Sequence, residues 1–227
     1  MGVAIKHGSP VEAGGGPAIA LATSQTQLLD SRLRRLAGEE QWSQLPESVR
    51  RRFSKRITPG TPTIYCGEVV LTEMSRAGRV LAFLARLIGS PLPLDNRAAG
   101  PCVVTVTEEA GAPGQTWTRC FARPSGARQI IRSMKCFRGP TGLEEHVGAG
   151  IGMALRVSVD DGALYFRSED YFLEAGPVRL RLPRLLSPGR MEIVHRQEAN
   201  GTFSFRLTLT HAYFGRLLRQ LAYYRDP

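Results

Sequence analysis

The stretch Val157-Ser158-Val159-Asp160-Asp161-Gly162-Ala163-Leu164-Tyr165-Phe166 decides the fold. It predicts a β-hairpin with Asp161-Gly162 as a two-residue type I′ loop, since both loop positions need positive φ, which Gly adopts freely and Asp tolerates. Val159 then faces Leu164 on an apolar face, and a slip by one residue would turn that face outward. The same register predicts the cross-strand pairs Val157–Phe166, Ser158–Tyr165 and Arg156–Arg167.

Other segments repeat this alternation of apolar and polar residues and are predicted to be strands. They are Thr63–Glu73, residues 102–106 and 117–121, Arg128–Phe137, Val178–Leu182, Met191–Gln197 and Phe203–Leu209. At Asn200-Gly201 a two-residue loop would place Phe205 opposite Arg196, so we expect a longer loop or a bulge there. Consecutive strands of this kind favour one antiparallel sheet of about eight strands, which is large enough to curl.

Apolar residues at helical spacing predict four helices, over Gln25–Ala37, Pro46–Lys55, Ser75–Ile88 and Ala212–Tyr224. The segment Ser75–Ile88 carries a continuous apolar stripe with its arginines off the stripe, which is typical of a helix that covers a core. The stripe consists of Ala77, Val80, Leu81, Leu84, Leu87 and Ile88.

Together these elements predict an α+β fold. We expect a curved antiparallel half-barrel of about eight strands wrapped around the central amphipathic helix Ser75–Ile88, with helices near the N-terminus and a short C-terminal helix. Residues 1–23 contain Gly14-Gly15-Gly16-Pro17 and little that could be buried, so a disordered tail is expected. Residues 24–227 are then a single α+β domain.

The formal net charge of +10 comes almost entirely from arginine, because the only lysines are Lys6, Lys55 and Lys135. Such a charge is compatible with nucleic acid, anionic lipid or an acidic partner. The arginines are scattered through strands and loops, and no basic-aromatic strand motif of the RNA-binding type is present, which argues against nucleic acid. The densest basic groups lie between Arg32 and Arg56.

The sequence also predicts the cellular compartment and the redox state of the cysteines. The longest apolar run, Val80–Ile88, is too short to span a bilayer, and Met1–Ala22 lacks a continuous signal-peptide core, so we expect a cytoplasmic protein without a transmembrane segment. The four cysteines have no C-x-x-C spacing. They are expected to be buried free thiols, and neither a disulfide framework nor a zinc site is predicted.

Several short motifs, in order, are similar to those of one bacterial family. They are Tyr65-x-Gly67, Pro91-Leu92-Pro93, Trp117-x-Arg119-x-Phe121, Gly142-Leu143-Glu144-Glu145, Asp161-Gly162-Ala163-Leu164, Leu182-Pro183 and His211-x-x-Phe214-Gly215. From about Leu45 to Tyr224 the chain resembles the domain of unknown function catalogued under the number 4166. The resemblance implies a domain that stands alone or follows an NAD-dependent reductase-like domain, and it implies no established reaction or cofactor.

A ligand site is predicted on the concave side of the sheet. Arg119 shares a strand face with Trp117 and Phe121, and an inward arginine requires a carboxylate partner, which Glu144 or Glu145 would supply. The alternative is a structural ion pair without a ligand. Further candidate ligand-binding residues are Tyr165 and Tyr171, which would line the entrance or lie on the surface.

Catalytic chemistry has only two candidates, Glu145 and His211, because a carboxylate with an imidazole can transfer protons near neutral pH. The histidines show no paired spacing, so no metal site and no cofactor are predicted.

Three functions remain open from the sequence. The first is a non-enzymatic module that holds an apolar or amphipathic, lipid-like molecule in an apolar cavity. The second is a cofactor-independent isomerase or cyclase that uses Arg119, Glu145 and His211. The third is a docking module that contacts a reductase-like partner through the basic segment Arg32–Arg56. The sequence does not supply the identity of the ligand, the oligomeric state or the pathway.

Overall fold

The computed structural model describes residues 30–89, 92–93, 99–122 and 126–226. The predicted tail 1–23, the start of the first predicted helix and Pro91 lie outside these residues. The described helices are α1 (Arg32–Ala37), α2 (Glu39–Ser43), α3 (Glu47–Phe53), α4 (Arg76–Leu84) and the 3₁₀ helix η1 (Ala85–Ile88). The described strands are β1 (Thr63–Met74), β2 (Gly100–Glu108), β3 (Gly114–Ala122), β4 (Arg128–Cys136), β5 (Glu144–Gly148), β6 (Ile151–Asp160), β7 (Ala163–Ala175), β8 (Val178–Arg181), β9 (Arg190–Gln197), β10 (Phe203–His211) and β11 (Gly215–Arg225).

The predicted hairpin is confirmed as β6 and β7. Asp161 and Gly162 both have positive φ, at 45° and 67°, as a type I′ loop requires. Val159 pairs with Leu164, and the predicted pairs Val157–Phe166, Ser158–Tyr165 and Arg156–Arg167 are also present. The longer loop around Asn200-Gly201 is confirmed too, because Phe205 pairs with His195 and not with Arg196.

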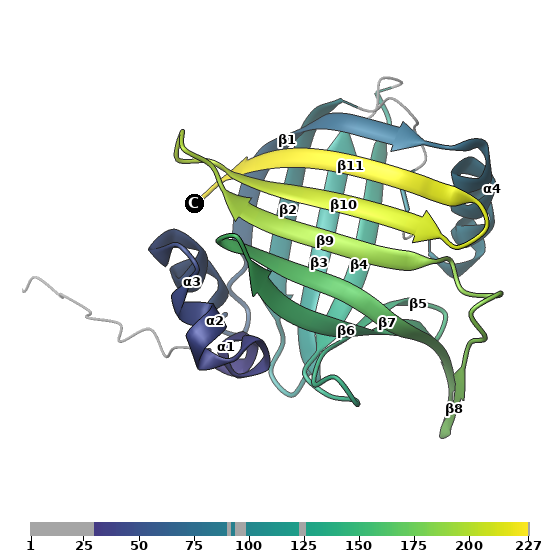
Figure 1. The fold of residues 1–227 in the computed structure, drawn as a ribbon, viewed down its shortest axis with the longest axis horizontal. Coiled ribbons are helices and arrows are strands. Elements are labelled where there is room, and N and C mark those ends of the chain that lie inside the picture. The colour runs from purple at the N-terminus through teal and green to yellow at the C-terminus, as the bar shows by residue number, and fades with distance from the viewer. Residues whose placement is uncertain (1–29, 90–91, 94–98, 123–125, 227) are drawn as a thin grey trace, which may run out of the picture.

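The sheet closes on itself, which corrects the predicted half-barrel (Figure 1). Its strand order is β6-β5-β4-β3-β2-β1-β11-β10-β9-β7-β8, and β6 also pairs with β7. The result is a closed barrel of ten antiparallel strands with β8 as an additional strand on β7, in a mostly β molecule. An α+β half-barrel of about eight strands is therefore wrong, because pairing at both edges of β6 removes the free edges that a half-barrel would expose.

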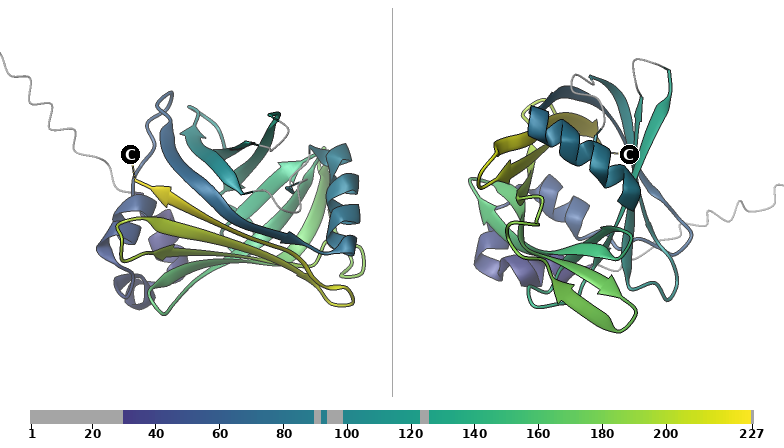
Figure 2. Two further views of the ribbon diagram at one scale, coloured as in Figure 1. Left: turned by 90° about the horizontal axis from the view of Figure 1, so that it is seen from above. Right: turned by 90° about the vertical axis from the view of Figure 1, so that its right-hand side faces the viewer.

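The helix predicted at the centre lies instead across one end of the barrel, which we call the mouth (Figure 2). Its range is as expected, with Ser75 capping α4 by accepting a hydrogen bond from the backbone N–H of Gly78. Two glycines allow this segment to pack closely on the strands. Gly78 of α4 contacts β11, where an added Cβ would lie 2.1 Å from the carbonyl oxygen of Leu217, and Gly148 of β5 contacts η1, where an added Cβ would lie 2.2 Å from the carbonyl oxygen of Ile88. The α4–η1 segment thus crosses from β11 to the β5–β6 turn. Much of its predicted apolar stripe, including Val80, Leu84 and Leu87, is exposed.

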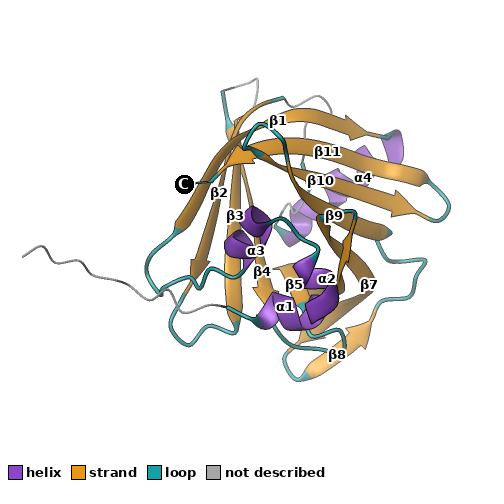
Figure 3. Cartoon of the chain, turned by 60° about the vertical axis from the view of Figure 1, so that its left-hand side comes forward, coloured by secondary structure: helices purple, strands orange, loops and turns teal. Residues whose placement is uncertain are grey.

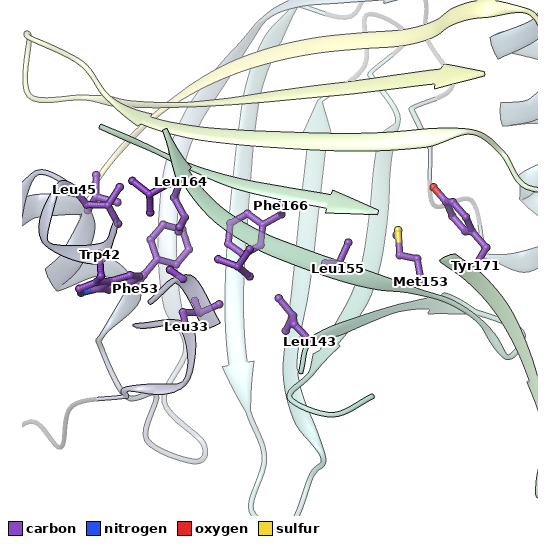
Figure 4. Packing of buried hydrophobic residues seen from close by; sticks show 14 residues of the cluster. Leu33, Trp42, Leu45, Phe53, Leu143, Met153, Leu155, Leu164, Phe166 and Tyr171 are labelled. Carbon is purple, nitrogen blue, oxygen red and sulfur yellow. The ribbon is translucent and has the colours of Figure 1, made fainter. Parts of the chain in front are cut away.

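The opposite end of the barrel is covered by α1, α2 and α3, and we call it the closed end (Figure 3). Trp42, Val49 and Phe53 bury their side chains in one core cluster with residues of β6 and β7. Figure 4 follows this cluster from Leu45 beside the helices to Met153 and Tyr171 farther along the barrel wall. Arg52 fixes the C-terminus to the same end through a 2.5 Å ion pair with Asp226. The two predicted N-terminal helices are therefore present in shorter form as α1 and α3. Together with α2, which was not predicted, they form the floor of the barrel.

The predicted C-terminal helix Ala212–Tyr224 is wrong, because Gly215–Arg225 forms strand β11 between β1 and β10. Leu218 pairs with Leu209, whereas the next pair is Arg216 with Thr210, so Leu217 is an extra residue in the ladder. This bulge buries Leu217 and Leu218 side by side. Their spacing from Phe214 and Leu221 then imitates the period of a helix.

Replacing Gly162 by valine should destabilise the hairpin, because a β-branched residue resists the left-handed backbone that this position requires. The expected cost is about 1–2 kcal/mol. For a chain of this size the corresponding decrease in Tm is roughly 2–8 °C. Thermal unfolding followed by circular dichroism measures it. Asp161→Asn is the control and should leave Tm nearly unchanged, and an equal loss in both variants would contradict the assigned turn.

Candidate functional site

The barrel encloses a cavity of about 800 Å³ that extends from the floor to the mouth. Leu33 and Phe53 line it at the closed end, and Leu84 and Phe214 line it at the mouth. A barrel of ten strands is wider than the eight-stranded barrels that hold one small ligand, so its own side chains leave this space open. The volume lies within the range of small-molecule sites.

One polar cluster interrupts the apolar lining. Among the described lining residues only Arg119, Lys135 and Glu145 carry a formal charge at neutral pH. The ammonium of Lys135 lies 2.7 Å from Glu145 Oε2, and Arg119 Nη2 lies 3.6 Å from Glu145 Oε1. Ser133 connects the two sides, because its hydroxyl donates to Glu145 Oε1 at 2.6 Å and accepts from Arg119 Nη1 at 3.0 Å.

Neighbouring strands bring these groups together. Trp117 of β3 pairs with Ser133 of β4, and Lys135 of β4 pairs with Glu145 of β5, so alternate residues of three adjacent strands face the same interior. Two cations surround one carboxylate, which leaves the cluster with a net charge of +1. A group of this charge favours the entry of an anionic or carbonyl-bearing ligand.

The electrostatics keep Glu145 ionised. Burial alone would raise the pKa of Glu145, but Lys135 and Arg119 outweigh burial and lower this pKa to about 2. Burial lowers the pKa of Lys135, against the attraction of Glu145. The carboxylate is therefore a permanent partner for the two cations and a poor proton acceptor at neutral pH.

Trp117 supplies a donor that is not used within the described part of the protein. Its indole Nε1 is buried and has no hydrogen-bond partner there. Buried donors are normally satisfied, and this unused donor belongs to a side chain that lines the cavity. The ammonium of Lys135 lies 5.0 Å from the centroid of the Trp117 ring, so the cation and the aromatic face stabilise each other.

Most of the residues predicted as ligand-binding line the cavity. Trp117, Arg119, Phe121, Glu145 and Tyr171 do so. The predicted partnership of Arg119 with a carboxylate is present, and the carboxylate is that of Glu145.

Glu144 and Tyr165 are not among the residues that line the cavity. Glu144 is fully buried on the other face of β5, where Arg179 and Arg138 bind its carboxylate. Tyr165 packs with Ala163 and Val194 outside the barrel interior. Tyr171 reaches the interior although it has the same parity as Tyr165, because β7 contains one extra residue between the pairs Leu155–Ser168 and Met153–Tyr171.

His211 also lines the cavity but lies away from the polar cluster. It is at the end of β10, and β10 is four strands from β3 and four strands from β5 around the barrel. At about 4.8 Å per strand this is roughly 19 Å along the wall. In the described residues no hydrogen bond or ion pair joins His211 to Arg119 or Glu145; its Nδ1 accepts from the backbone N–H of Tyr213 at 3.2 Å.

Sequence reasoning missed Lys135 and Ser133. The available signal was alternation, because Ile131, Ser133 and Lys135 occupy the face of β4 that pairs with Trp117 and Arg119. Lys135 is also one of only three lysines in an arginine-rich chain. A buried position on a strand is an unusual place for such a residue.

Other chemistries have less support in the structure. The described residues contain no group of three or more His, Cys, Asp and Glu side chains placed to hold a metal ion. No helix within the described ranges has the length and apolar character needed to cross a membrane. The four cysteines are free thiols; Cys102 and Cys136 are buried, whereas Cys66 is exposed, contrary to expectation.

Comparison with protein families gives one result. A family model described as Domain of unknown function (DUF4166) matches residues 45–223. The chain belongs to this family. The DUF4166 match includes all the residues of the polar cluster and every strand of the barrel except the last two residues of β11. It begins after α1 and α2, so part of the floor lies outside the matched segment. No curated protein matches this DUF4166 chain.

Glu145→Gln should destabilise the DUF4166 barrel by about 3–5 kcal/mol at pH 7, because Lys135 and Arg119 would remain buried without their counter-charge. The pKa of Glu145 is lowered on folding, so the stability from its ionised form is complete above about pH 4.5 and is lost as the pH falls toward about 2. Urea unfolding of both proteins between pH 2 and 7 measures this. The difference in unfolding free energy between them should decrease as the pH falls from about 4.5 toward about 2.

Glu192→Gln is the matched control. Glu192 pairs with Arg167 at 2.6 Å, and these side chains are 35% and 28% exposed. Removing an ion pair of this kind should cost at most about 1 kcal/mol. If the difference in unfolding free energy between Glu145→Gln and the original protein does not change with pH, the buried carboxylate of Glu145 is not ionised as described.

Proposed function

We propose that this protein binds one amphipathic small molecule inside the barrel, with an apolar body and an anionic or carbonyl-bearing head group. The observation that carries the proposal is the cavity of about 800 Å³, whose mostly apolar described lining contains a single cluster of charged side chains. The apolar surface provides affinity for a hydrocarbon body, and the few polar groups orient the ligand.

The head group would bind between Trp117 and Arg119. The indole N–H of Trp117 has no partner among the described residues, and Arg119 is the less tightly held of the two cations, at 3.6 Å from Glu145 compared with 2.7 Å for Lys135. A carboxylate placed there would accept hydrogen bonds from both donors, and it would neutralise the net charge of the cluster.

The geometry supports binding better than acid–base catalysis. A general base acts best with a pKa near the working pH, and the pKa of Glu145 is held at about 2. Glu145 is also engaged by Lys135, Arg119 and Ser133 at the same time, and His211 does not contact it.

Docking of a reductase-like partner through Arg32–Arg56 has weaker support. Arg32 pairs with Asp30 and Glu108, Arg34 with Glu39, and Arg52 with Asp226. Part of the positive charge in this segment is thus already matched within the chain. We infer a cytoplasmic location, supported by four free cysteines, which reducing compartments maintain.

Binding of cis-parinaric acid, a fluorescent fatty acid, tests the proposed function. Of the two tryptophans only Trp117 lines the cavity, so bound probe should quench its emission and gain fluorescence by energy transfer. Arg119→Gln should raise the Kd for the acid by roughly tenfold to a hundredfold, the value of one charged hydrogen-bonding group. The Kd for the corresponding alcohol should change much less.

Arg132→Gln is the control, because Arg132 is exposed on the opposite face of β4 from Ser133 and Lys135. It should bind the acid as the original protein does. The proposal fails if delipidated protein binds neither the acid nor the alcohol, or if native mass spectrometry and the probe agree that the cavity takes no amphipathic molecule.

A further inference from the structure

Large apolar side chains gather in solvent at the mouth of the barrel. They come from three segments: α4 with η1, the loop between β8 and β9, and the turn between β10 and β11, which lie at the same end (Figures 1 and 2). Eight of them are at least half exposed, namely Val80, Phe83, Leu84, Leu87, Leu185, Leu186, Tyr213 and Phe214. Isolated exposed apolar residues need no explanation, but a concentration of this kind marks an interaction surface.

The same three segments are strongly basic. Residues 75–89, 183–190 and 211–216 contain six arginines and no aspartate or glutamate. Arg79, Arg86 and Arg184 are exposed beside the apolar residues. Arg216 is also exposed and lies 3.5 Å from Glu73 at the end of β1. The mouth therefore presents apolar groups among positive charges.

We propose that the mouth docks on the surface of an anionic phospholipid membrane. Its exposed aliphatic and aromatic side chains would enter the boundary between head groups and acyl chains, while its arginines would remain at the level of the lipid phosphates. Tyr213, which is 73% exposed, belongs to the residue types that favour this interface.

The chemistry of the surface favours a membrane over an acidic protein. An acidic protein partner would match the arginines but would leave the most exposed side chains, such as Leu87 at 85% and Leu186 at 73%, against polar groups. A bilayer with anionic head groups matches both features at once, because charge and hydrocarbon lie within a few ångströms of each other at its surface.

Docking would also place the cavity entrance at the membrane. Val80, Leu84, Leu185, Leu186 and Phe214 belong both to the exposed group and to the cavity lining. An amphipathic molecule could then pass between bilayer and barrel along continuous apolar surface. This exchange route rests on the proposed function, whereas attachment to the membrane depends only on the exterior of the mouth.

The test measures binding of the delipidated full chain to vesicles by flotation. Vesicles of phosphatidylcholine with 30% phosphatidylglycerol should bind the protein, pure phosphatidylcholine should bind it weakly, and 0.5 M NaCl should reduce binding. The triple variant Phe83→Glu, Leu87→Glu and Tyr213→Glu should lower the partition coefficient by roughly tenfold or more. None of these three residues lines the cavity, so parinarate binding in solution should persist.

A matched control carries the same charge change on the barrel wall. Ile64, Val70 and Ile130 are 44%, 44% and 51% exposed, and their replacement by glutamate should have a much smaller effect on vesicle binding. Reversal of Arg79, Arg86 and Arg184 to glutamate should abolish the preference for anionic lipid. Reversal of Arg35, Arg51 and Arg132, exposed elsewhere, should reduce it far less.

The outcomes separate this proposal from the function. If the protein binds parinarate but does not bind anionic vesicles, the proposed docking surface is wrong and the proposed binding function stands. Protein that binds vesicles through the mouth but holds no probe supports the docking surface and overturns the proposed function. Equal losses of vesicle binding in the mouth and wall variants would contradict the docking surface. The docking surface would also be contradicted if the original protein bound no vesicles but formed a dimer that the mouth variant dissociates.

Discussion

The hydrogen-bonded closure between β6 and β7 is the constraint on which the rest of the structure depends. Because β6 also pairs with β5, the sheet has no free edge within the ring of ten strands, and its inward residues must face one another across a shared interior. Ten strands set a width that the side chains do not fill. The closure therefore produces the cavity, and it also holds Trp117, Arg119, Lys135 and Glu145 at fixed positions on three neighbouring strands.

Local patterns predicted the local structure well. The Asp161-Gly162 turn needs two residues with positive φ, a requirement that few sequences meet, so its register could be predicted pair by pair. Closure could not be predicted in this way, because besides the local β6–β7 hairpin it needs β1 to pair with β11, and these two strands come from opposite ends of the barrel sequence. An apolar stripe on Ser75–Ile88 indicated that the helix packs on something, but it did not distinguish the interior of a sheet from the end of a barrel.

Two irregularities decided where prediction of strands and sites failed. The extra residue Leu217 in β11 gave apolar spacing that matches a helix, and a periodicity argument has no means to recognise one inserted residue. The bulge in β7 reversed the parity between Tyr165 and Tyr171, so only the second faces the cavity. Trp117, Arg119 and Phe121 lie on an uninterrupted strand, and for them simple alternation was sufficient. Lys135 was missed, although the same alternation on β4 places its side chain in the barrel interior.

The position of the floor has a consequence for any shortened form of the chain. Residues 45–223 contain every barrel strand except the last two residues of β11. Leu33 lines the cavity and Trp42 is buried at the closed end, yet both precede that segment. A fragment that starts at Leu45 could keep all strand pairings and still lose α1 and α2, which form part of the floor that separates the cavity from water. Of the three floor helices it would retain only α3, so the bottom of the cavity would be covered less completely.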